Sequence, residues 1–254
     1  MAESHLIYQV AVEGAQDKFA PCIESVISYA DRIGARHICQ TEPRLRIAPV
    51  KSARSANALR FGYLPIYEKE NAFSFLHEYT SVLILDADVY VRKSAPDIFK
   101  ESAADFAGVV ERDMPLTPRY FDKIRKYSKG QYETLKDVDW KWNQDGAEFF
   151  NMGVMLLNSS IRPHLYGQDP EEFIRRPEFE RFVNGEGHWK WSTDQTLLNY
   201  WVKKSGMTAH HLDWRWNALY GAVGNVSDAH FVHFFLSDKL PRRGAEIPDL
   251  IRQL

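Results

Sequence analysis

Cysteine, net charge and long apolar runs are all scarce in this sequence, and each scarcity excludes a class of protein. Cys22 and Cys39 are the only cysteines, and two cysteines cannot build a disulfide framework or a zinc knuckle. We expect both to be reduced thiols in the core. The 32 basic and 34 acidic side chains leave a net charge of -2. That balance supplies no field to hold a phosphate backbone, so we expect no nucleic-acid partner.

Membrane-spanning and disordered proteins are excluded in the same way. No apolar run approaches the roughly 20 residues that span a bilayer, and the first residues lack a basic segment followed by a long apolar one. We therefore expect a cytoplasmic protein with no integral membrane segment. Hydrophobic residues make up 44% and charged residues 26% of the 254 positions, as in an ordinary globular chain. A chain of this length can form one domain with its own hydrophobic core, and we expect a single domain over residues 1–254.

The apolar pattern predicts an α/β fold. An unbroken apolar run at 81–85 is typical of a central parallel strand that is covered on both faces. Further strands are predicted at 6–12, 36–39, 105–110, 149–158, 207–212 and 229–235, and helices at 17–34, 55–61, 66–79, 170–183 and 192–203. We expect a Rossmann-like, mixed but mainly parallel sheet flanked by helices in a single domain.

Asp86 and Asp88 directly follow the apolar run at 81–85. An i, i+2 pair that leaves a strand projects both carboxylates to the same side, at the edge of an open α/β sheet where ligands bind. Two carboxylates suit Mn²⁺ or Mg²⁺, and either cation can neutralise a diphosphate. The alternative is a solvated strand end, where Asp is a common turn residue.

Two histidines and a lysine near the end of the sequence are candidate partners for this pair. His230 and His233 lie in one predicted strand and face opposite ways, so at most one of them faces the carboxylates. An imidazole added to two carboxylates favours Mn²⁺ or another first-row metal over Ca²⁺. Lys239 could hold a phosphate as a point charge. The alternatives are hydrogen-bonded structural histidines and a solvated surface lysine.

Three further polar residues have both functional and structural interpretations. The amide of Asn151, at the start of a predicted strand, could bind a sugar hydroxyl through both its donor and its acceptor. It could equally be a strand-edge residue that satisfies the backbone. Asp194 and Gln195 lie in the first turn of a predicted helix, where an acid favours the helix dipole and a Gln completes a cap. The residues alone favour capping for this pair.

Residues 112–146 form the longest stretch without strong periodicity. Loops of this length in compact domains tend to be binding loops or lids. Aromatic residues and a basic group that includes Lys123, Arg125, Lys126 and Lys129 are concentrated here. We predict an acceptor-side loop or lid, in which aromatic faces with cationic neighbours could hold a sugar or an anionic glycan acceptor. The alternative is that these rings pack the loop onto the domain.

Taken in chain order, these blocks resemble the family-8 glycosyltransferases, the group that includes glycogenin and bacterial galactosyltransferases. Residues 83–89 resemble the D-x-D strand of that family, residues 150–158 its F-N-x-G-V-x-x-x-N strand, and residues 193–199 its D-Q-x-x-L-N helix. His233 with Lys239 reproduces an H-x5-K spacing, and Tyr67 with Lys69 gives a weaker Tyr-x-Lys match. The sequence departs from the family at Leu236, where Gly is common, and has no Trp after Pro241.

The resemblance implies a GT-A fold and roles for individual residues. It places a metal on Asp86, Asp88 and His233, with His230 structural. It places the diphosphate on Lys239, and Lys69 near the donor phosphates or sugar. Asn151, Asp194 and Gln195 line the donor-sugar and acceptor side.

The activity implied by the resemblance is transfer of a hexose from a nucleotide sugar, UDP-linked, with retention of anomeric configuration. The cofactor would be Mn²⁺, or Mg²⁺, and the acceptor a glycan, a protein or a lipid-linked sugar. Two alternatives remain open. One is a haloacid-dehalogenase-like phosphohydrolase, whose D-x-D-x-[TV] motif Asp86 and Asp88 partly match, although Tyr90 replaces Thr or Val. The other is a catalytically inactive relative that binds sugars or nucleotides.

Overall fold

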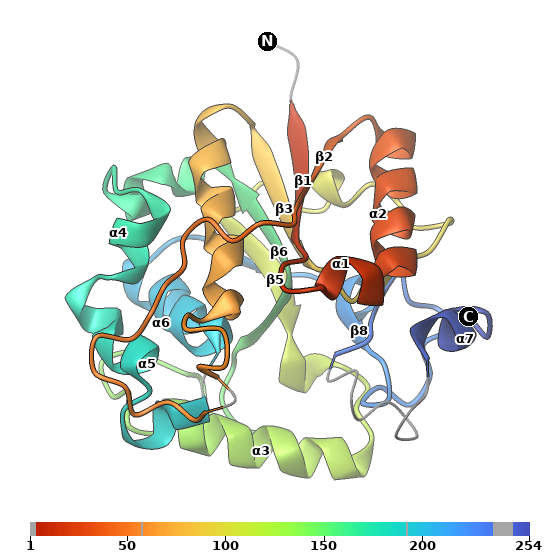
Figure 1. The fold of residues 1–254 in the computed structure, drawn as a ribbon. Helices are drawn as coiled ribbons and strands as arrows, with labels where there is room; N and C mark the ends of the chain where they lie inside the picture. The colour runs from red at the N-terminus through yellow and green to blue at the C-terminus, as the bar shows by residue number, and fades with distance from the viewer. Residues whose placement is uncertain (1–3, 57, 192, 236–245) are drawn as a thin grey trace.

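The computed structural model describes residues 4–56, 58–191, 193–235 and 246–254 (Figure 1). Its strands are β1 (His5–Val10), β2 (Arg36–Gln40), β3 (Ser81–Asp86), β4 (Val89–Val91), β5 (Phe106–Val110), β6 (Phe150–Asn158), β7 (Ala209–His211), β8 (Ala218–Leu219) and β9 (Phe231–His233). The α-helices are α1 (Ala15–Lys18), α2 (Ala20–Ile33), α3 (Pro118–Tyr132), α4 (Pro170–Ile174), α5 (Glu180–Asn184), α6 (Asp194–Ser205) and α7 (Ile247–Ile251). Short 3-10 helices are η1 (Pro65–His77), η2 (Ile98–Lys100), η3 (Glu111–Asp113), η4 (Ser159–Leu165), η5 (Pro177–Phe179), η6 (Gly187–Trp191) and η7 (Trp214–Asn217).

A six-stranded sheet with the order β2-β1-β3-β6-β5-β7 forms the centre of the molecule. Pairing of β1 with β2 and β3, and of β5 with β7, is parallel, whereas β6 runs antiparallel to both of its neighbours. In Figure 1, α2 lies on one side of this sheet, and η1 and α6 lie on the other. The predicted mixed, mainly parallel sheet flanked by helices is confirmed.

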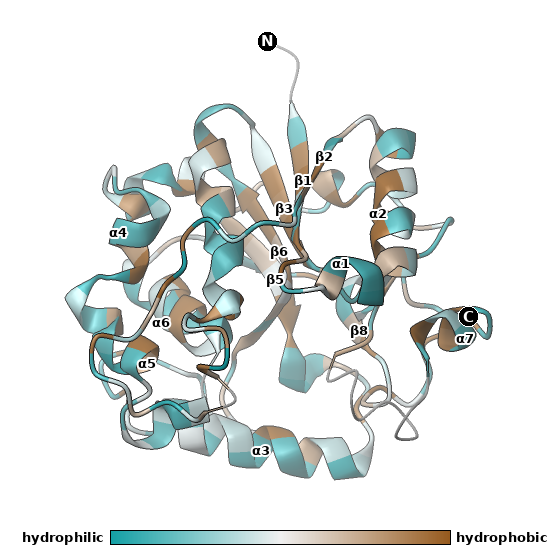
Figure 2. Cartoon of the chain, in the orientation of Figure 1, coloured by the Kyte–Doolittle hydropathy of each residue, from teal (hydrophilic) through white to brown (hydrophobic). Residues whose placement is uncertain are grey.

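The central strands are hydrophobic on both faces because helices cover both. In β3, the four residues Val82–Leu85 are at most 1% exposed. Figure 2 shows the central strands in brown, between helices whose outward surfaces are teal. Cys22 is buried and Cys39 half-buried, and both are free thiols, as predicted. Among the helices that the structure describes, none is long and apolar enough to cross a membrane.

A second, three-stranded sheet positions the end of β3. Its order is β4-β9-β8, and Val89 at the start of β4 pairs with His233 at the end of β9. Because only Ala87 and Asp88 separate β3 from β4, this pairing brings a residue from the far end of the sequence to the Asp pair. The point where the two sheets meet is therefore fixed by backbone pairing.

The segment 112–146 differs from the predicted loop because it contains the 15-residue helix α3. Pro118 is at the first helical turn, where its missing N–H costs nothing. Ile124, Ser128 and Tyr132 recur at intervals of four and are buried, while charged residues cover the opposite face. This amphipathic pattern is sparse in apolar residues, and the sequence therefore did not indicate a helix. The segment 55–61, predicted as a short helix, consists of turns over its described residues.

Leu83→Ala should strongly destabilise the fold, since Leu83 is fully buried in the central strand. A cavity of this kind costs about 2–5 kcal/mol in the free energy of unfolding. Ile27→Ala is the matched control, because Ile27 is 42% exposed on α2, and a surface change typically costs about 0.5 kcal/mol. Urea unfolding of both variants measures the difference. Equal losses would contradict the central position of β3.

Candidate functional site

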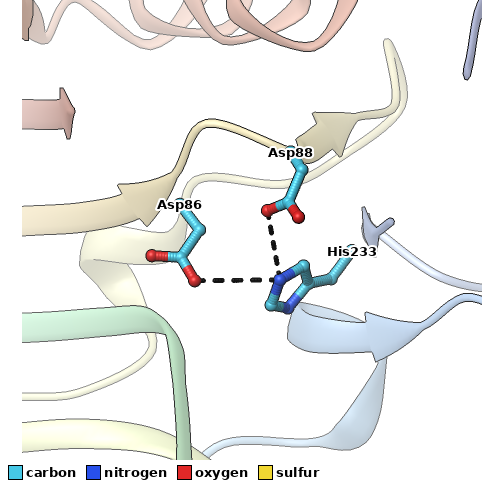
Figure 3. A group of neighbouring side chains, drawn as sticks. All are labelled: Asp86, Asp88 and His233. Carbon is cyan, nitrogen blue, oxygen red and sulfur yellow. Dashed lines mark ion pairs between the residues drawn. The ribbon is translucent and has the colours of Figure 1, made fainter. Parts of the chain in front are cut away.

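Asp86, Asp88 and His233 converge at the carboxyl end of β3 (Figure 3). The Nε2 atom of His233 lies 3.2 Å from Oδ1 of Asp88 and 3.8 Å from Oδ2 of Asp86. Each residue offers one ligand atom, and the three atoms lie within 4.8 Å of one another. His230 has a different environment, because its ring stacks at a tilt on Trp216. The structure thus brings together the predicted carboxylate pair and the predicted histidine.

The donor set fits a small divalent cation. Ligand atoms that share one cation at about 2.1 Å each lie at most about 4.2 Å apart. Both His233–carboxylate separations are shorter than that, and all three ligand atoms lie within 4.8 Å of one another. Two carboxylates with one imidazole form a mixed oxygen and nitrogen site, which suits Mn²⁺ better than Ca²⁺. Among the residues that the structure describes, these three could therefore hold a metal.

The charges within this group stabilise one another. Burial would lower the pKa of His233, but the neighbouring Asp88 and then Asp86 carboxylates raise it above its usual value. Burial would raise the pKa of Asp88, but the imidazole of His233 holds it below its usual value. A closely spaced imidazolium and carboxylate favour each other's charged form. A bound cation would take the place of the proton on His233 Nε2.

The other side of the His233 ring is fixed by two residues. Its Nδ1 atom lies 3.0 Å from Oδ1 of Asn217, at the end of η7. Gly153 in β6 passes so close that a Cβ there would lie 2.2 Å from Cε1 of His233. Only glycine leaves room for the ring in this position, and the Asn217 contact orients its nitrogen atoms.

Lys69 links η1, which carries it, to three other elements beside Asp86. Its Nζ lies 2.7 Å from Oδ1 of Asp86 and 2.8 Å from Oδ2 of Asp194, and it donates to the carbonyl oxygen of Met152 at 2.8 Å. Burial would lower the pKa of Lys69, but Asp194 and then Asp86 raise it above its usual value. The ammonium group thus has three short contacts within the protein and joins η1, β3, β6 and α6.

Asn151 is buried and Gln195 is half-buried, and the side chain of Asn151 does satisfy the backbone, because its Oδ1 accepts from the N–H of Gly153 at 3.1 Å. Asn151 is in β6, which is flanked on both sides, so it is not at a sheet edge. The amino-terminal cap of α6 is Thr193, whose side chain accepts from the N–H of Gln195. The side chain of Gln195 points elsewhere, since its Oε1 accepts from the N–H of Met152 at 3.3 Å. Both side-chain amides therefore contact the backbone of β6 at residues 152–153.

Glu111, which the sequence reasoning missed, completes this group. It follows β5 directly, is 4% exposed, and accepts through Oε2 from Asn151 Nδ2 at 3.2 Å and from Gln195 Nε2 at 3.5 Å. Burial raises its pKa to about 7, against hydrogen bonds from Asn151 and Tyr120 that lower it. An acid immediately after a buried strand is the signal that identified Asp86, and the same rule applied to the strand at 105–110 would have found Glu111.

A continuous hydrogen-bonded chain connects Glu111 to the metal-ligand group. Asn151 donates to Glu111, and its Oδ1 accepts from Nδ2 of Asn217 at 2.9 Å. Asn217 in turn contacts His233. The side chain of Asn151 thus has its donor and its acceptor both used within the protein, and it positions its neighbours.

A cavity of about 290 Å³ opens beside the carboxylates. Asp86, Asp88, Lys69 and Asp194 line its polar side, and Val10, Val12, Phe19 and Ile66 are among the residues that line its apolar side. Near the end of β1, the hydroxyl group of Tyr63 donates to Glu13 at 2.7 Å. Lys239, the predicted diphosphate ligand, lies outside the described residues.

Comparisons with known proteins find likeness in structure only. No protein-family model matches the chain, and no curated protein matches its sequence. A glycosyltransferase involved in the glycosylation of the major capsid of PBCV-1 shares 14% identity, over 91% of this chain and 93% of that one, with a TM-score of 0.52. Mouse xyloside xylosyltransferase 1 in its apo form shares 16% identity, over 93% and 99%, with a TM-score of 0.50.

A third structure, the apo form of the bifunctional glycosyltransferase WbbM, shares 14% identity over 92% of this chain and 46% of that one, with a TM-score of 0.51. At such identities the likeness shows the fold alone. The fold is therefore the GT-A fold of these glycosyltransferases, as the sequence resemblance implied.

Gly153→Ala should weaken Mn²⁺ binding by about tenfold or more, because the new methyl group displaces the His233 ring. Electron paramagnetic resonance titration with Mn²⁺ measures this. Gly130→Ala is the control, since an added Cβ on this α3 residue meets no atom within 4 Å, and it should leave Mn²⁺ binding unchanged. Equal Mn²⁺ affinities in the two variants would show that His233 is not a ligand.

Glu111 should make the fold less stable as the pH rises. Folding raises its pKa from 4.5 to about 7, so between these values the unfolded chain binds fewer protons than the folded one. The free energy of unfolding therefore falls by about 3 kcal/mol across this window. Glu111→Gln cannot ionise and should lack this fall. Urea unfolding of both proteins between pH 4.5 and 8 measures it, and a constant difference between them would contradict the raised pKa.

Proposed function

We propose that the chain is a metal-dependent glycosyltransferase of family 8, which moves a hexose from a UDP-linked sugar to a glycan, protein or lipid-linked acceptor with retention of anomeric configuration. The observation that carries the proposal is the Asp86, Asp88 and His233 group at the carboxyl end of β3 in a chain with the GT-A fold. The order of the sequence blocks that resemble family 8 supports it further.

In this proposal the nucleotide sugar occupies the cavity beside Asp86 and Asp88. A divalent cation on Asp86, Asp88 and His233 would supply positive charge opposite the diphosphate, where negative charge develops as the glycosidic bond breaks. The apolar residues of the cavity suit the flat face of a base. Lys69 contributes by fixing Asp86 and Asp194, because its ammonium group already contacts both. The role of Lys239 in holding the diphosphate remains a prediction.

The transferred sugar and the acceptor would lie on the side of the site formed by Gln195, Asp194 and Glu111. The acceptor hydroxyl oxygen forms a bond to the anomeric carbon, and the bond from that carbon to the diphosphate breaks. The electron pair leaves with the diphosphate, which also receives the hydroxyl proton. The carboxylates of Asp194 and Glu111 and the amide of Gln195 are suited to hydrogen-bonding sugar hydroxyl groups, and Asn151 positions Glu111.

Asp88→Asn should reduce donor hydrolysis to background, since it removes one charge from the metal group without removing a core contact. We suggest a panel of nucleotide sugars with Mn²⁺, scored for release of the free sugar without acceptor. Asp228→Asn, which changes an exposed carboxylate in a turn, is the matched control and should retain full activity. Near-normal activity of Asp88→Asn, or full activity after exhaustive chelation, would contradict the proposed site.

Thermal unfolding in the presence of nucleotides measures binding independently of turnover. UDP with Mn²⁺ at 100 times its dissociation constant should add about 2.7 kcal/mol to the stability of the native protein. UDP with Mn²⁺ should add little to the stability of the Asp88→Asn variant. A larger shift with another nucleotide and none with UDP would overturn the choice of donor. A shift with UDP but no turnover of any donor would indicate a catalytically inactive relative.

A further inference from the structure

The face of α3 that points away from the site forms one side of a groove of about 490 Å³. The other side is the turn at 142–146. The groove is lined mainly by Arg125, Lys126 and Lys129 from the helix and by Trp142, Asn143 and Gln144 from the turn. None of these residues contributes to the site described above.

The turn at 142–146, which carries Trp142, is held in place by hydrogen bonds and by packing. Asn143 and Gly146 exchange two backbone hydrogen bonds of 3.2 Å, and Nη1 of Arg112 donates to the carbonyl oxygens of Lys141 and Gly146 at 2.7 Å each. Gly146 has a φ of 109° and approaches α3 so closely that a Cβ there would lie 2.4 Å from Oγ of Ser128. The turn therefore docks directly onto the helix, and the groove between them is a fixed feature.

The groove carries positive charge that the protein leaves largely uncompensated. Arg125 pairs with Asp122, the one carboxylate in the lining. Within the described part of the chain, Lys126 and Lys129 make no ion pair, and both are exposed. Trp142 is 43% exposed, although most large aromatic residues of the chain are buried. Exposed ammonium groups beside an exposed indole combine a site for an anion with a flat apolar platform.

We propose that this groove binds an anionic carbohydrate, meaning sugar units that bear carboxylate or sulfate groups. A sugar ring can stack on the indole of Trp142, while its anionic groups contact Lys126 and Lys129 through charge-assisted hydrogen bonds. The side-chain amide of Gln144 is available for hydroxyl groups. A single indole and a few cations form a small patch, which suits one or two sugar units better than the extended surface that a nucleic acid covers.

The position of the groove links it to the proposed function, on which this part of the inference rests. The opposite face of α3 borders the site, because Tyr120 contacts Glu111 and Tyr127 contacts Gln195 through their hydroxyl groups. The two faces are separated by one helix diameter of about 10–12 Å, and an oligosaccharide that joined them would pass around the helix. The groove would then hold the distal part of an acidic glycan acceptor whose reactive end lies near Glu111.

Calorimetric titration of the full chain with defined hexasaccharides tests the inference. The probes are a hyaluronan hexasaccharide with carboxylates only, a chondroitin sulfate hexasaccharide with carboxylates and sulfates, and the neutral sugar maltohexaose. We expect at least one of the two charged hexasaccharides to bind and maltohexaose not to bind, and the comparison identifies the anionic group. Lys126→Ala with Lys129→Ala should weaken binding by about tenfold, and Trp142→Ala should weaken it several-fold.

Arg119→Ala with Lys136→Ala is the matched control, because it removes the same charge from exposed positions near α3 that do not line the groove. It should leave hexasaccharide binding within about twofold, a difference of about 0.4 kcal/mol. The inference is overturned if this control loses as much affinity as the groove variant, if neither charged hexasaccharide binds, or if a hexaglutamate peptide or an oligothymidylate binds more tightly than both.

Titration with UDP and Mn²⁺ distinguishes failure of this inference from failure of the proposed function. The groove variants should bind UDP with unchanged affinity, since their changed residues lie outside the donor cavity. If the chain binds charged hexasaccharides through Lys126 and Lys129 but binds no nucleotide, the groove inference stands and the proposed transferase function is contradicted. Loss of UDP affinity in the folded groove variants would place this segment over the donor site and would overturn the separate groove.

Discussion

The burial of one ammonium group between two carboxylates is the constraint on which the site depends. Lys69 is 8% exposed and contacts Asp86 and Asp194 at 2.7 and 2.8 Å. A buried charge is costly unless its partners are close and its remaining donors are used, and the carbonyl of Met152 uses a further donor. Removal of Lys69 would leave the neighbouring carboxylates of Asp86 and Asp194 without this shared counter-charge. The end of β3 and the starts of α6 and β6 are therefore held together by electrostatics as well as by packing.

A second constraint follows from the hydrogen-bonded chain between Glu111 and His233. Asn151 and Asn217 each use both a donor and an acceptor within this chain, so their amide orientations are fixed by their neighbours. Such networks rigidify a site when every member has a partner. The imidazole of His233 and the carboxyl group of Glu111 are thus positioned by the same two amides.

The helix α3 relates the site to the outer surface. Tyr120 and Tyr127 on its inner face contact Glu111 and Gln195, while Lys126 and Lys129 lie on its outer face. The alternative considered from the sequence, that the aromatic rings of this segment pack it onto the domain, holds for Tyr132 and Trp140, which stack on each other in the core. Trp142 is different, because it remains exposed beside the basic residues. One segment therefore combines packing residues with residues that are free to bind a ligand.

The sequence by itself determined the α/β class, the central strand at 81–85 and the position of Asp86 and Asp88 at its carboxyl end. These follow from local patterns, because an unbroken apolar run specifies a strand covered on both faces and an i, i+2 spacing specifies a common side. The alternation of side chains along the predicted strand also showed that at most one of His230 and His233 can face the carboxylates of Asp86 and Asp88. Local patterns could not show which of the two histidines faces the carboxylates.

The resemblance to family 8 implied that His233 is this partner, and the tertiary structure shows the physical reason, which is the pairing of β4 with β9 between residues far apart in the chain. Gln195 is a second case in which a tertiary contact decides. The local pattern assigned it to a helix cap, but its side chain reaches Met152 and Glu111 instead. The need for glycine at position 153 likewise arises from the approach of His233, not from the conformation of β6. Spacing fixes which face of an element a side chain occupies, whereas packing between distant segments fixes what that face meets.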